Sequence, residues 1–456
     1  MSHFADVSEA RAFLAANPDI RRVHLLFTDV TGTFRGKAVQ AHELEAVFRT
    51  GRPLPTSTLS MSIRGEDVPE AGLLWEVGDK DCTLRPIAGT LVRCPWITVP
   101  TAQVLLAVDP GSVPAIHADP RAALVRVTDR LRADGFHPVM ACELEFYLFD
   151  RERDPQGALQ PARGYLSGER PTQSQVCHTT AIEDMAPFFD ELYDCAEAQG
   201  IAAETAISEF AAGQWELTLH HKADPLRAVD EGIMLKRLVK AVAQKHGLIA
   251  SFMAKPLTNE SGSGMHVHVS LADEAGANLF AGGEPDGGPL LRKAVAGLLA
   301  TMQDGVAVFA PGANSFRRFR AGSYAPTTKT WGIDNRTVAV RVTSGDPQTR
   351  HIEHRTAGAD ANAYAVAAAV LAGLHHGITE GLAPPPAIEG NGYDQPGEPL
   401  PTDWRAAIAL FENSVVLRRY LGDDFVRIYS CVKRFECEVF QAEVSDRDLL
   451  WYLRDA

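Results

Sequence analysis

The sequence has no long hydrophobic run, no excess of basic charge and no closely spaced cysteine pair. No apolar stretch approaches the roughly 18 residues that a membrane span needs, and 58 acidic residues against 44 basic ones give a net charge of −14. Nucleic-acid binders and proteins of anionic membrane surfaces usually present a basic face. The seven cysteines form no C-x-x-C pair and are odd in number, which indicates reduced thiols. We therefore expect neither nucleic acid nor membrane as a partner, and a small substrate.

Signals for secretion and for familiar nucleotide loops are also missing. The first 20 residues have a helical pattern without a basic region followed by an apolar one, so we expect a cytoplasmic protein. No G-x-x-x-x-G-K-[ST] motif occurs, and "GSGMHV" has no third glycine for a dinucleotide turn. Any phosphate chemistry must therefore depend on other residues.

The pattern of apolar runs and turn residues changes near residue 105. Before it, short apolar runs such as "RRVHLLFTDV" and "LLWEV" are joined by Gly and Pro turns, which is typical of a small mixed β domain. After it, "DPRAALVRVTDRLRADGF" predicts a helix with Asp119 as N-cap and Gly135 at its end. Strand-like "HPVMACELEFYLFD", helical "EDMAPFFDELYDCAEAQG" and strand-like "GQWELTLHH" follow, and further helices close the chain over residues 403–456. This order favours an α+β or α/β sheet with a site on one face.

Carboxylates recur on the predicted strands. Glu143 and Glu145 in "CELEFYLFD" lie two residues apart, so they share one strand face, and two like charges that close need a cation between them. Three later segments, "SEFAAGQWE", "GSGMHVHVS" and "RHIEHRT", add Glu209, Glu216, His266, His268 and Glu353. Oxygen-rich ligand sets of this kind suit Mg²⁺ or Mn²⁺ more than Zn²⁺.

Arginines are equally dense further along the chain. The segments "NSFRRFRAGSYAP", "DNRTVAVRV" and "HIEHR" supply Arg317, Arg318, Arg336, Arg341 and Arg355. Arginines beside metal-holding carboxylates suit a transferring phosphoryl group, because its charge is spread over several oxygens. Each motif also has a simpler interpretation: E-x-E as an exposed strand face, H-x-H as a packed pair or part of a zinc amidohydrolase site, and FRRFR as a solvated basic patch. Taken singly, none predicts a function.

Together and in this order, the motifs resemble one family. "CELEFYLFD", "SEFAAGQWE", "SGSGMHVHVS", "NSFRRF", "DNRTVAVRV" and "HIEHR" are similar to the successive active-site motifs of the glutamine synthetase superfamily, in its bacterial class I-like branch. The resemblance implies an α+β fold with a small N-terminal β-grasp domain, residues 1–105, and a large catalytic domain, residues 106–456. The catalytic domain would carry its metals on a curved antiparallel sheet with flanking helices. The resemblance also implies a homo-oligomer, a dodecamer of two hexameric rings whose active sites are shared between neighbouring subunits.

The resemblance assigns a role to each motif residue. Two or three Mg²⁺ or Mn²⁺ ions would bind per site, one of them at Glu145, Glu209 and Glu216 and a second at Glu143, His266 and Glu353. The residues expected around ATP are His268, Ser270, Arg336, Arg341 and Arg355. The residues expected around glutamate are Gly262, Gly264, His266 and Arg318. Glu209, Arg336 and Arg355 would act in catalysis, with Glu209 as the candidate base.

Departures from the ammonia-using members indicate the acceptor. Those enzymes carry an N-terminal acid that helps to bind ammonium, whereas "LPTSTLSMSIRG" here is followed by its first acid only at Glu66. A flap glutamate of those enzymes is replaced by Tyr324, and an asparagine before the glycine loop by Ser261. These changes resemble the γ-glutamylamine and γ-glutamylpolyamine synthetase branch. We therefore expect ATP-dependent ligation of the γ-carboxyl of L-glutamate to an organic amine through γ-glutamyl phosphate, with Tyr324 in the amine pocket.

Two other functions stay open at this point. The first is an ordinary ammonia-using glutamine synthetase with an unusual acceptor pocket. The second is a non-catalytic relative kept as a binding or structural assembly, although all six expected metal ligands are present. The loop "GNGYDQPGE" around Tyr393 only loosely resembles the tyrosine segment that some bacterial members adenylylate, and we do not predict that modification.

Overall fold

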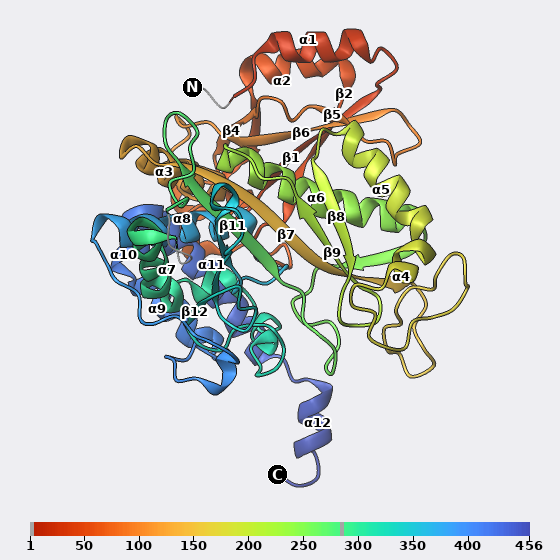
Figure 1. The fold of residues 1–456 in the computed structure, drawn as a ribbon. Helices are drawn as coiled ribbons and strands as arrows, with labels where there is room; N and C mark the ends of the chain where they lie inside the picture. Colours follow the sequence, from red (N-terminus) through yellow and green to blue (C-terminus); the bar gives the residue numbers. More distant parts are fainter. Residues whose placement is uncertain (1–3, 283–286) are drawn as a thin grey trace.

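The computed structural model describes residues 4–282 and 287–456, in which helices surround two β-sheets (Figure 1). The first sheet has the strand order β2-β1-β6-β4-β3, with β5 beside β6. Its strands are β1 Arg22–Thr28, β2 Phe34–Gln40, β3 Arg52–Pro55, β4 Asp81–Pro86, β5 Val92–Arg93 and β6 Thr101–Val108. β1 and β2 form an antiparallel pair and β1 lies parallel to β6, so the early and late strands of this region meet at its centre.

Two helices accompany the first sheet, α1 Val7–Ala16 and α2 Leu44–Thr50. Asp6 caps α1 by accepting the Ser8 N–H at 2.9 Å. Along the chain α2 lies between β2 and β3, and the β-grasp fold expected for this region stays a prediction. The expected strand-like run "LLWEV" is wrong, because residues 75–77 form a short 3-10 turn and Trp75 is 74% exposed. The expected boundary after residue 105 falls inside β6, which ends at Val108, and the expected division into two domains stays a prediction.

The second sheet has the order β12-β13-β14-β11-β7-β9-β8, with β10 beside β7. Its strands are β7 His137–Asp150, β8 Ala203–Ser208, β9 Gln214–Leu219, β10 Leu248–Ser251, β11 Met265–Ala272, β12 Trp331–Ile333, β13 Val340–Val342 and β14 Ile352–His354. Neighbouring strands are antiparallel except β12 and β13, which are parallel. The expectation of an antiparallel sheet therefore holds for all pairs but this edge pair.

Helices cover this curved sheet and form the large buried core beside it (Figure 1). They are α3 Pro120–Ala133, α4 Thr179–Asp184, α5 Ala186–Ala198, α6 Pro225–Lys245, α7 Gly288–Phe309, α8 Ala363–Thr379, α9 Trp404–Asn413, α10 Val415–Leu421 and α11 Asp423–Ala442, whereas α12 Asp446–Tyr452 has no buried residue and projects away (Figure 1). The backbones of α7 and α8 nearly touch, since a Cβ on Gly297 would lie 2.1 Å from the Gly373 carbonyl oxygen. Glycine is therefore required at this crossing.

The predicted helix over residues 119–135 is confirmed, with Asp119 accepting the backbone N–H groups of Arg121 and Ala122. The helix predicted from residue 183 is interrupted instead, because α4 ends at Asp184 and α5 begins at Ala186. Pro187 lacks the N–H that a continuous helix would use, and it also disfavours helical geometry in the residue before it. The closing helices predicted for residues 403–456 are present as α9 to α12.

Buried polar contacts join the first sheet to the helices of the second. Asn362, the N-cap of α8, donates from Nδ2 to the carbonyl oxygens of Asp29 at 3.3 Å and Val30 at 3.1 Å. A second buried contact joins two of these helices, since Arg121 on α3 forms a bidentate ion pair with Asp230 on α6, with both N···O distances at 2.9 Å. A pair that is buried and bidentate is costly to break once formed. Among the described residues, no helix is long and apolar enough to cross a membrane.

Candidate active site

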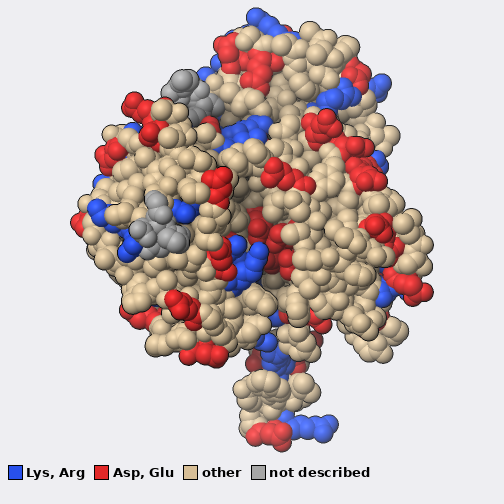
Figure 2. All heavy atoms as spheres, in the orientation of Figure 1, with Lys and Arg blue, Asp and Glu red and all other residues tan. Residues whose placement is uncertain are grey.

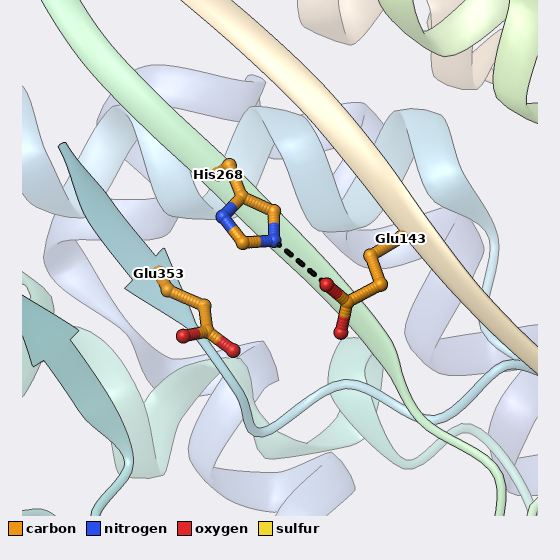
Figure 3. Close-up of side chains that lie close together, drawn as sticks. All are labelled: Glu143, His268 and Glu353. Carbon is orange, nitrogen blue, oxygen red and sulfur yellow. Dashed lines mark hydrogen bonds and ion pairs between the residues drawn. The ribbon is translucent and has the colours of Figure 1, made fainter. Parts of the chain in front are cut away.

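Three neighbouring strands present carboxylates and imidazoles on one face of the second sheet (Figure 3). In the register of the sheet, His266 on β11 stands opposite Glu143 on β7, and His268 stands opposite Glu353 on β14. The period of two along each strand then directs both histidines to the face that carries Glu143 and Glu145. His268 Nε2 lies 3.2 Å from Glu143 Oε2, and His266 Nδ1 lies 3.5 Å from Glu353 Oε1 and also contacts Glu143 directly.

Two groups of these side chains have ligand atoms within 4.8 Å of one another, one made of Glu143, His268 and Glu353 and the other of Glu143, Glu145 and His266. Five of the side chains expected around metal or nucleotide therefore converge. The expected set of Glu143, His266 and Glu353 also lies together, since His266 Nδ1 contacts Glu143 and lies 3.5 Å from Glu353 Oε1, so the expected partition stays a prediction. His268, which we expected along the nucleotide, groups with Glu143 and Glu353, whereas His266 groups with the carboxylate pair of β7.

Glu209 and Glu216 border this cluster but belong to neither group. Glu216 on β9 stands opposite Glu145 in the strand register and is 7% exposed. Glu209 follows β8, and its carboxylate accepts a hydrogen bond from the Phe210 N–H at 3.1 Å. Burial together with Glu145 raises the pKa of Glu209 to about 7, and burial together with Glu143 and Glu145 raises the pKa of Glu216 to about 11. Buried carboxylates that repel one another in this way suit a cation bound among them.

The pKa values of Glu143 and Glu353 are shifted in the opposite direction, to below the usual range. Burial alone would raise the pKa of Glu143, but the adjacent His266 and His268 hold it well below its usual range. For Glu353 the effect of burial is outweighed by Arg355 and His266, which lower its pKa to about 2. Both groups are therefore ionised at neutral pH. A set of ionised carboxylates with one or two imidazoles fits Mg²⁺ or Mn²⁺, and neither of the two groups found among the described residues includes a cysteine, which would favour Zn²⁺.

We predict that the Glu216→Gln variant, without divalent cations, unfolds at the wild-type temperature or above it, because the amide is neutral without the proton that Glu216 must bind to be buried beside Glu143 and Glu145. The folded wild-type chain holds a proton on Glu216, with a pKa of about 11, that the unfolded chain, with a glutamate pKa of about 4.3, releases. Its stability therefore falls as pH rises through this range, and that of Glu216→Gln falls less. Added Mg²⁺ should raise the Tm of the wild type more than that of the variant.

Thermal unfolding at about pH 6 and pH 8, with EDTA and then with Mg²⁺, measures both effects. The matched control is Glu197→Gln, which changes an exposed carboxylate on α5 and should follow the wild type. Equal Mg²⁺-induced shifts in the wild type and Glu216→Gln would remove Glu216 from the metal site.

The arginines divide into paired and unpaired members. Arg341 Nη1 lies 2.8 Å from Glu353 Oε2, and Arg355 contacts the other oxygen of the same carboxylate. Arg336 lies in the exposed loop between β12 and β13, and within residues 4–282 and 287–456 it makes no ion pair or hydrogen bond. Ser270 lies two residues beyond His268 on the same face of β11. Of the residues expected around ATP, Arg341 and Arg355 thus contact Glu353, and the role of the whole set stays a prediction.

The glycine loop before β11 lies against a buried arginine. Gly264 donates its N–H to Glu145 Oε2 at 2.7 Å, and a Cβ on Gly264 would come within 3.1 Å of Arg318 Nη2. A Cβ on Gly262 would lie 2.5 Å from Arg318 Cγ. Arg318 is 4% exposed and donates to the Thr356 carbonyl oxygen at 3.1 Å. The two glycines therefore allow Arg318 to reach the carboxylate cluster.

Two residues of the site were missed by sequence reasoning. Gln214 Nε2 donates to the Gly262 carbonyl oxygen at 3.0 Å and reaches Glu145 Oε2 at 3.4 Å. His351 Nε2 lies 3.1 Å from His268 Nδ1. Gln214 precedes Glu216 by two positions and His351 precedes Glu353 by two, so strand alternation could have found both.

The positions that depart from ammonia-using enzymes are all placed by the structure. Tyr324 is 56% exposed in the turn after Arg318, and Ser261 offers its carbonyl oxygen to the Tyr147 hydroxyl at 2.6 Å. Glu66 is held locally by Ser62, at 3.3 Å, and by Arg64, at 3.5 Å. These contacts leave the predicted amine pocket untested.

Figure 2 shows acidic and basic side chains side by side in a hollow near the centre of one face. Carboxylates, imidazoles and arginines that converge on a sheet in this way define an enzyme that handles phosphate charge with divalent cations. A model of the catalytic domain of glutamine synthetase matches residues 117–452, and the chain belongs to the glutamine synthetase family.

Within this family the chain falls in the γ-glutamylamine synthetase branch. It is 39% identical to γ-glutamylputrescine synthetase PuuA of Escherichia coli (strain K12) over 99% of this chain and 96% of that relative. It is 32% identical to the glutamate–isopropylamine ligase of a Pseudomonas species over 95% of each chain. A solved GmaS/ADP complex superimposes with a TM-score of 0.83 at 26% identity over 99% of both chains.

Proposed function

We propose that the protein is an ATP-dependent ligase that joins the γ-carboxyl of L-glutamate to an organic amine, giving a γ-glutamylamide, ADP and phosphate. The observation that carries the proposal is the row of Glu143, Glu353 and two histidines on one sheet face, flanked by Arg341 and Arg355. Support for an organic amine comes from two relatives named for amine ligation, one with putrescine and one with isopropylamine.

In this proposal each residue of the site has a role. One cation would be held by Glu145, Glu209 and Glu216, and a second by Glu143, His266 and Glu353, with His268 as a further candidate ligand. The bound cations would neutralise phosphate charge and orient the phosphoryl group. The residues that would meet ATP are His268, Ser270, Arg336, Arg341 and Arg355. Gly262, Gly264, His266 and Arg318 would line the glutamate side, where Arg318 can hold a carboxylate.

The chemistry follows from the poor reactivity of a free carboxylate. A γ-carboxylate oxygen attacks the γ-phosphorus of ATP, the bond to the bridging oxygen breaks, and ADP leaves. The nitrogen of an uncharged amine then attacks the acyl carbon, phosphate departs, and the amine loses its proton to a base. Arg336 and Arg355 would stabilise the charge that develops on the phosphoryl oxygens. Glu209, which borders the cluster at the end of β8, is the candidate base.

Product analysis tests the reaction class. Incubation with glutamate, Mg²⁺, ATP and putrescine or isopropylamine should release ADP and phosphate, and mass spectrometry should find the corresponding γ-glutamylamide. ADP release that needs no glutamate, or a γ-glutamyl product that never appears, would contradict the proposal.

We also propose a dodecamer of two hexameric rings with shared active sites. Support comes from α12, which projects from the body of the protein (Figure 1). Its apolar side chains are exposed, with Leu450 at 81% and Trp451 at 57%, as is Leu453 directly after the helix, at 73%. Burial of each such side chain is worth about 1.5–3 kcal/mol, so a second subunit is expected to cover this helix.

Light scattering is expected to give a large assembly for the intact chain. A variant that ends at Glu443, and so lacks α12, should form a smaller one. The control is Arg454→Ala, which keeps the apolar side chains and should leave the mass unchanged. An active protein that is strictly monomeric would contradict the shared-site proposal.

A further inference from the structure

Tyr393 lies in a short 3-10 turn within the Pro/Gly-rich segment between α8 and α9. Its side chain is half-buried, and its hydroxyl donates to the Ala325 carbonyl oxygen at 2.9 Å. Ala325 follows Tyr324 directly, so this bond holds the turn that carries the predicted amine-pocket residue. A tyrosine whose hydroxyl points inward in this way is engaged in the fold of the protein rather than presented to solvent.

The backbone around Tyr393 is anchored on the loop that carries Arg336. Asn335 Nδ2 donates to the Gly390 carbonyl oxygen at 2.8 Å, and Gly392 donates its N–H to Thr337 Oγ1 at 2.8 Å. A Cβ on Gly392 would lie 2.8 Å from the Thr337 carbonyl oxygen, so only glycine permits this approach. The segment around Tyr393 is therefore hydrogen-bonded to the residues on both sides of Arg336. From this segment the Tyr393 side chain extends to the turn at Tyr324.

The turn itself, residues 320–325, is held under backbone strain. Tyr324 has a φ of +57°, which is uncommon for a residue other than glycine. Such conformations persist only where surrounding contacts fix them. Within the turn, Ser323 Oγ donates to the Arg318 carbonyl oxygen at 3.0 Å and to the Arg320 carbonyl oxygen at 2.6 Å. From outside the turn, the Tyr393 hydroxyl donates to Ala325 at its C-terminal end, and the carbonyl oxygen of Thr258 accepts from Arg320 Nη1 at 3.5 Å at its other end.

We infer that Tyr393 is a positioning residue, whose hydroxyl fixes the turn 320–325 and thereby sets the acceptor preference of the enzyme through Tyr324. This inference rests on the proposed function, because it assigns Tyr324 to the amine side of the site. The hydrogen bonds that Asn335 and Thr337 make with the segment around Tyr393 do not involve the Tyr393 hydroxyl. Loss of the hydroxyl should therefore loosen the turn while the phosphate-side loop keeps its place.

The Tyr393→Phe variant tests the inference, since it removes the hydroxyl and keeps the ring. Loss of one hydrogen bond of this kind should raise KM for the preferred amine about two- to tenfold, with KM for ATP unchanged. A merely structural weakening would lower the active fraction, and so kcat, without changing either KM. The second readout is limited trypsin digestion, in which cleavage after the exposed Arg320 should become faster in the variant.

Tyr193→Phe is the matched control, because the Tyr193 hydroxyl also donates to a backbone carbonyl at 2.9 Å, that of Glu204, outside the site. It should match the wild type in both readouts. Ser323→Ala, which loosens the same turn from inside, should change both in the direction of Tyr393→Phe. The trypsin readout needs no substrate, so it stands even if no organic amine is accepted. An unchanged cleavage rate, or an unchanged KM for the acceptor, would overturn the inference.

Discussion

The Glu353→Ala variant is expected to lose at least about a thousandfold in kcat, equivalent to about 4 kcal/mol of transition-state stabilisation. Glu353 is 1% exposed and contacts Arg341, Arg355 and His266. Its removal takes away a candidate metal ligand and leaves two arginine side chains without their carboxylate partner. The metal and phosphate sides of the site should therefore fail together.

Glu143→Ala should show a loss of similar size, since Glu143 belongs to both groups of candidate ligands. Steady-state ADP release measures the effect, and light scattering with circular dichroism establishes that each variant is assembled and folded. Glu197→Ala, on the exposed face of α5, should keep wild-type activity. Near-normal turnover in either site variant would show that the metal assignment is wrong.

Much of this site was predictable from the sequence, because its residues alternate along strands and so share one face. The period of two along "CELEFYLFD" and "MHVHVS" placed Glu143, Glu145, His266 and His268 on common faces, and the register of β7 and β11 brings those faces together. The helix at residues 119–135 was equally predictable, because its cap and its stop are local signals. Local periodicity therefore identified the residues of the cluster.

Other features depend on contacts between distant segments. The approach of Glu143, His268 and Glu353 depends on the pairing of β11 with β7 and β14, which no single segment encodes. The "LLWEV" segment has the composition of a strand, but residues 75–77 form a 3-10 turn, with Leu73 and Leu74 buried and Trp75 exposed. The role of Tyr393 required the fold, because its partner Ala325 is 68 positions away.

An organic amine is expected to be a better acceptor than ammonium. The acid that would attract ammonium in the N-terminal part is missing from "LPTSTLSMSIRG", and Tyr324 stands where a flap glutamate is expected in ammonia-using enzymes. The pocket would thus have less negative charge and one more aromatic wall. Such a wall can contact the carbon chain of an amine and attract its ammonium end by a cation–π interaction worth about 0.5–2 kcal/mol.

Both acceptors must lose a proton before attack, because an alkylammonium resembles a lysine side chain with a pKa of about 10.4. The need to lose a proton therefore does not distinguish an organic amine from ammonium. Contacts in the binding pocket decide which acceptor is preferred. A Tyr324→Ala variant should lose part of the preference for the amine while retaining turnover with ammonium. If Tyr324→Ala left the ratio unchanged, the aromatic wall would have no part in acceptor choice.

The most direct test of the proposed activity is the ratio of kcat/KM for organic amines to that for ammonium at matched concentrations. The panel should contain alkyl-, hydroxyalkyl-, aryl- and polyamines, with putrescine and isopropylamine among them, and ADP release should be paired with mass detection of each product. We expect at least one amine to exceed ammonium by about tenfold or more, which corresponds to about 1.4 kcal/mol. Efficient glutamine formation from ammonium, with no organic amine doing better, would contradict the account and identify an ammonia-using glutamine synthetase.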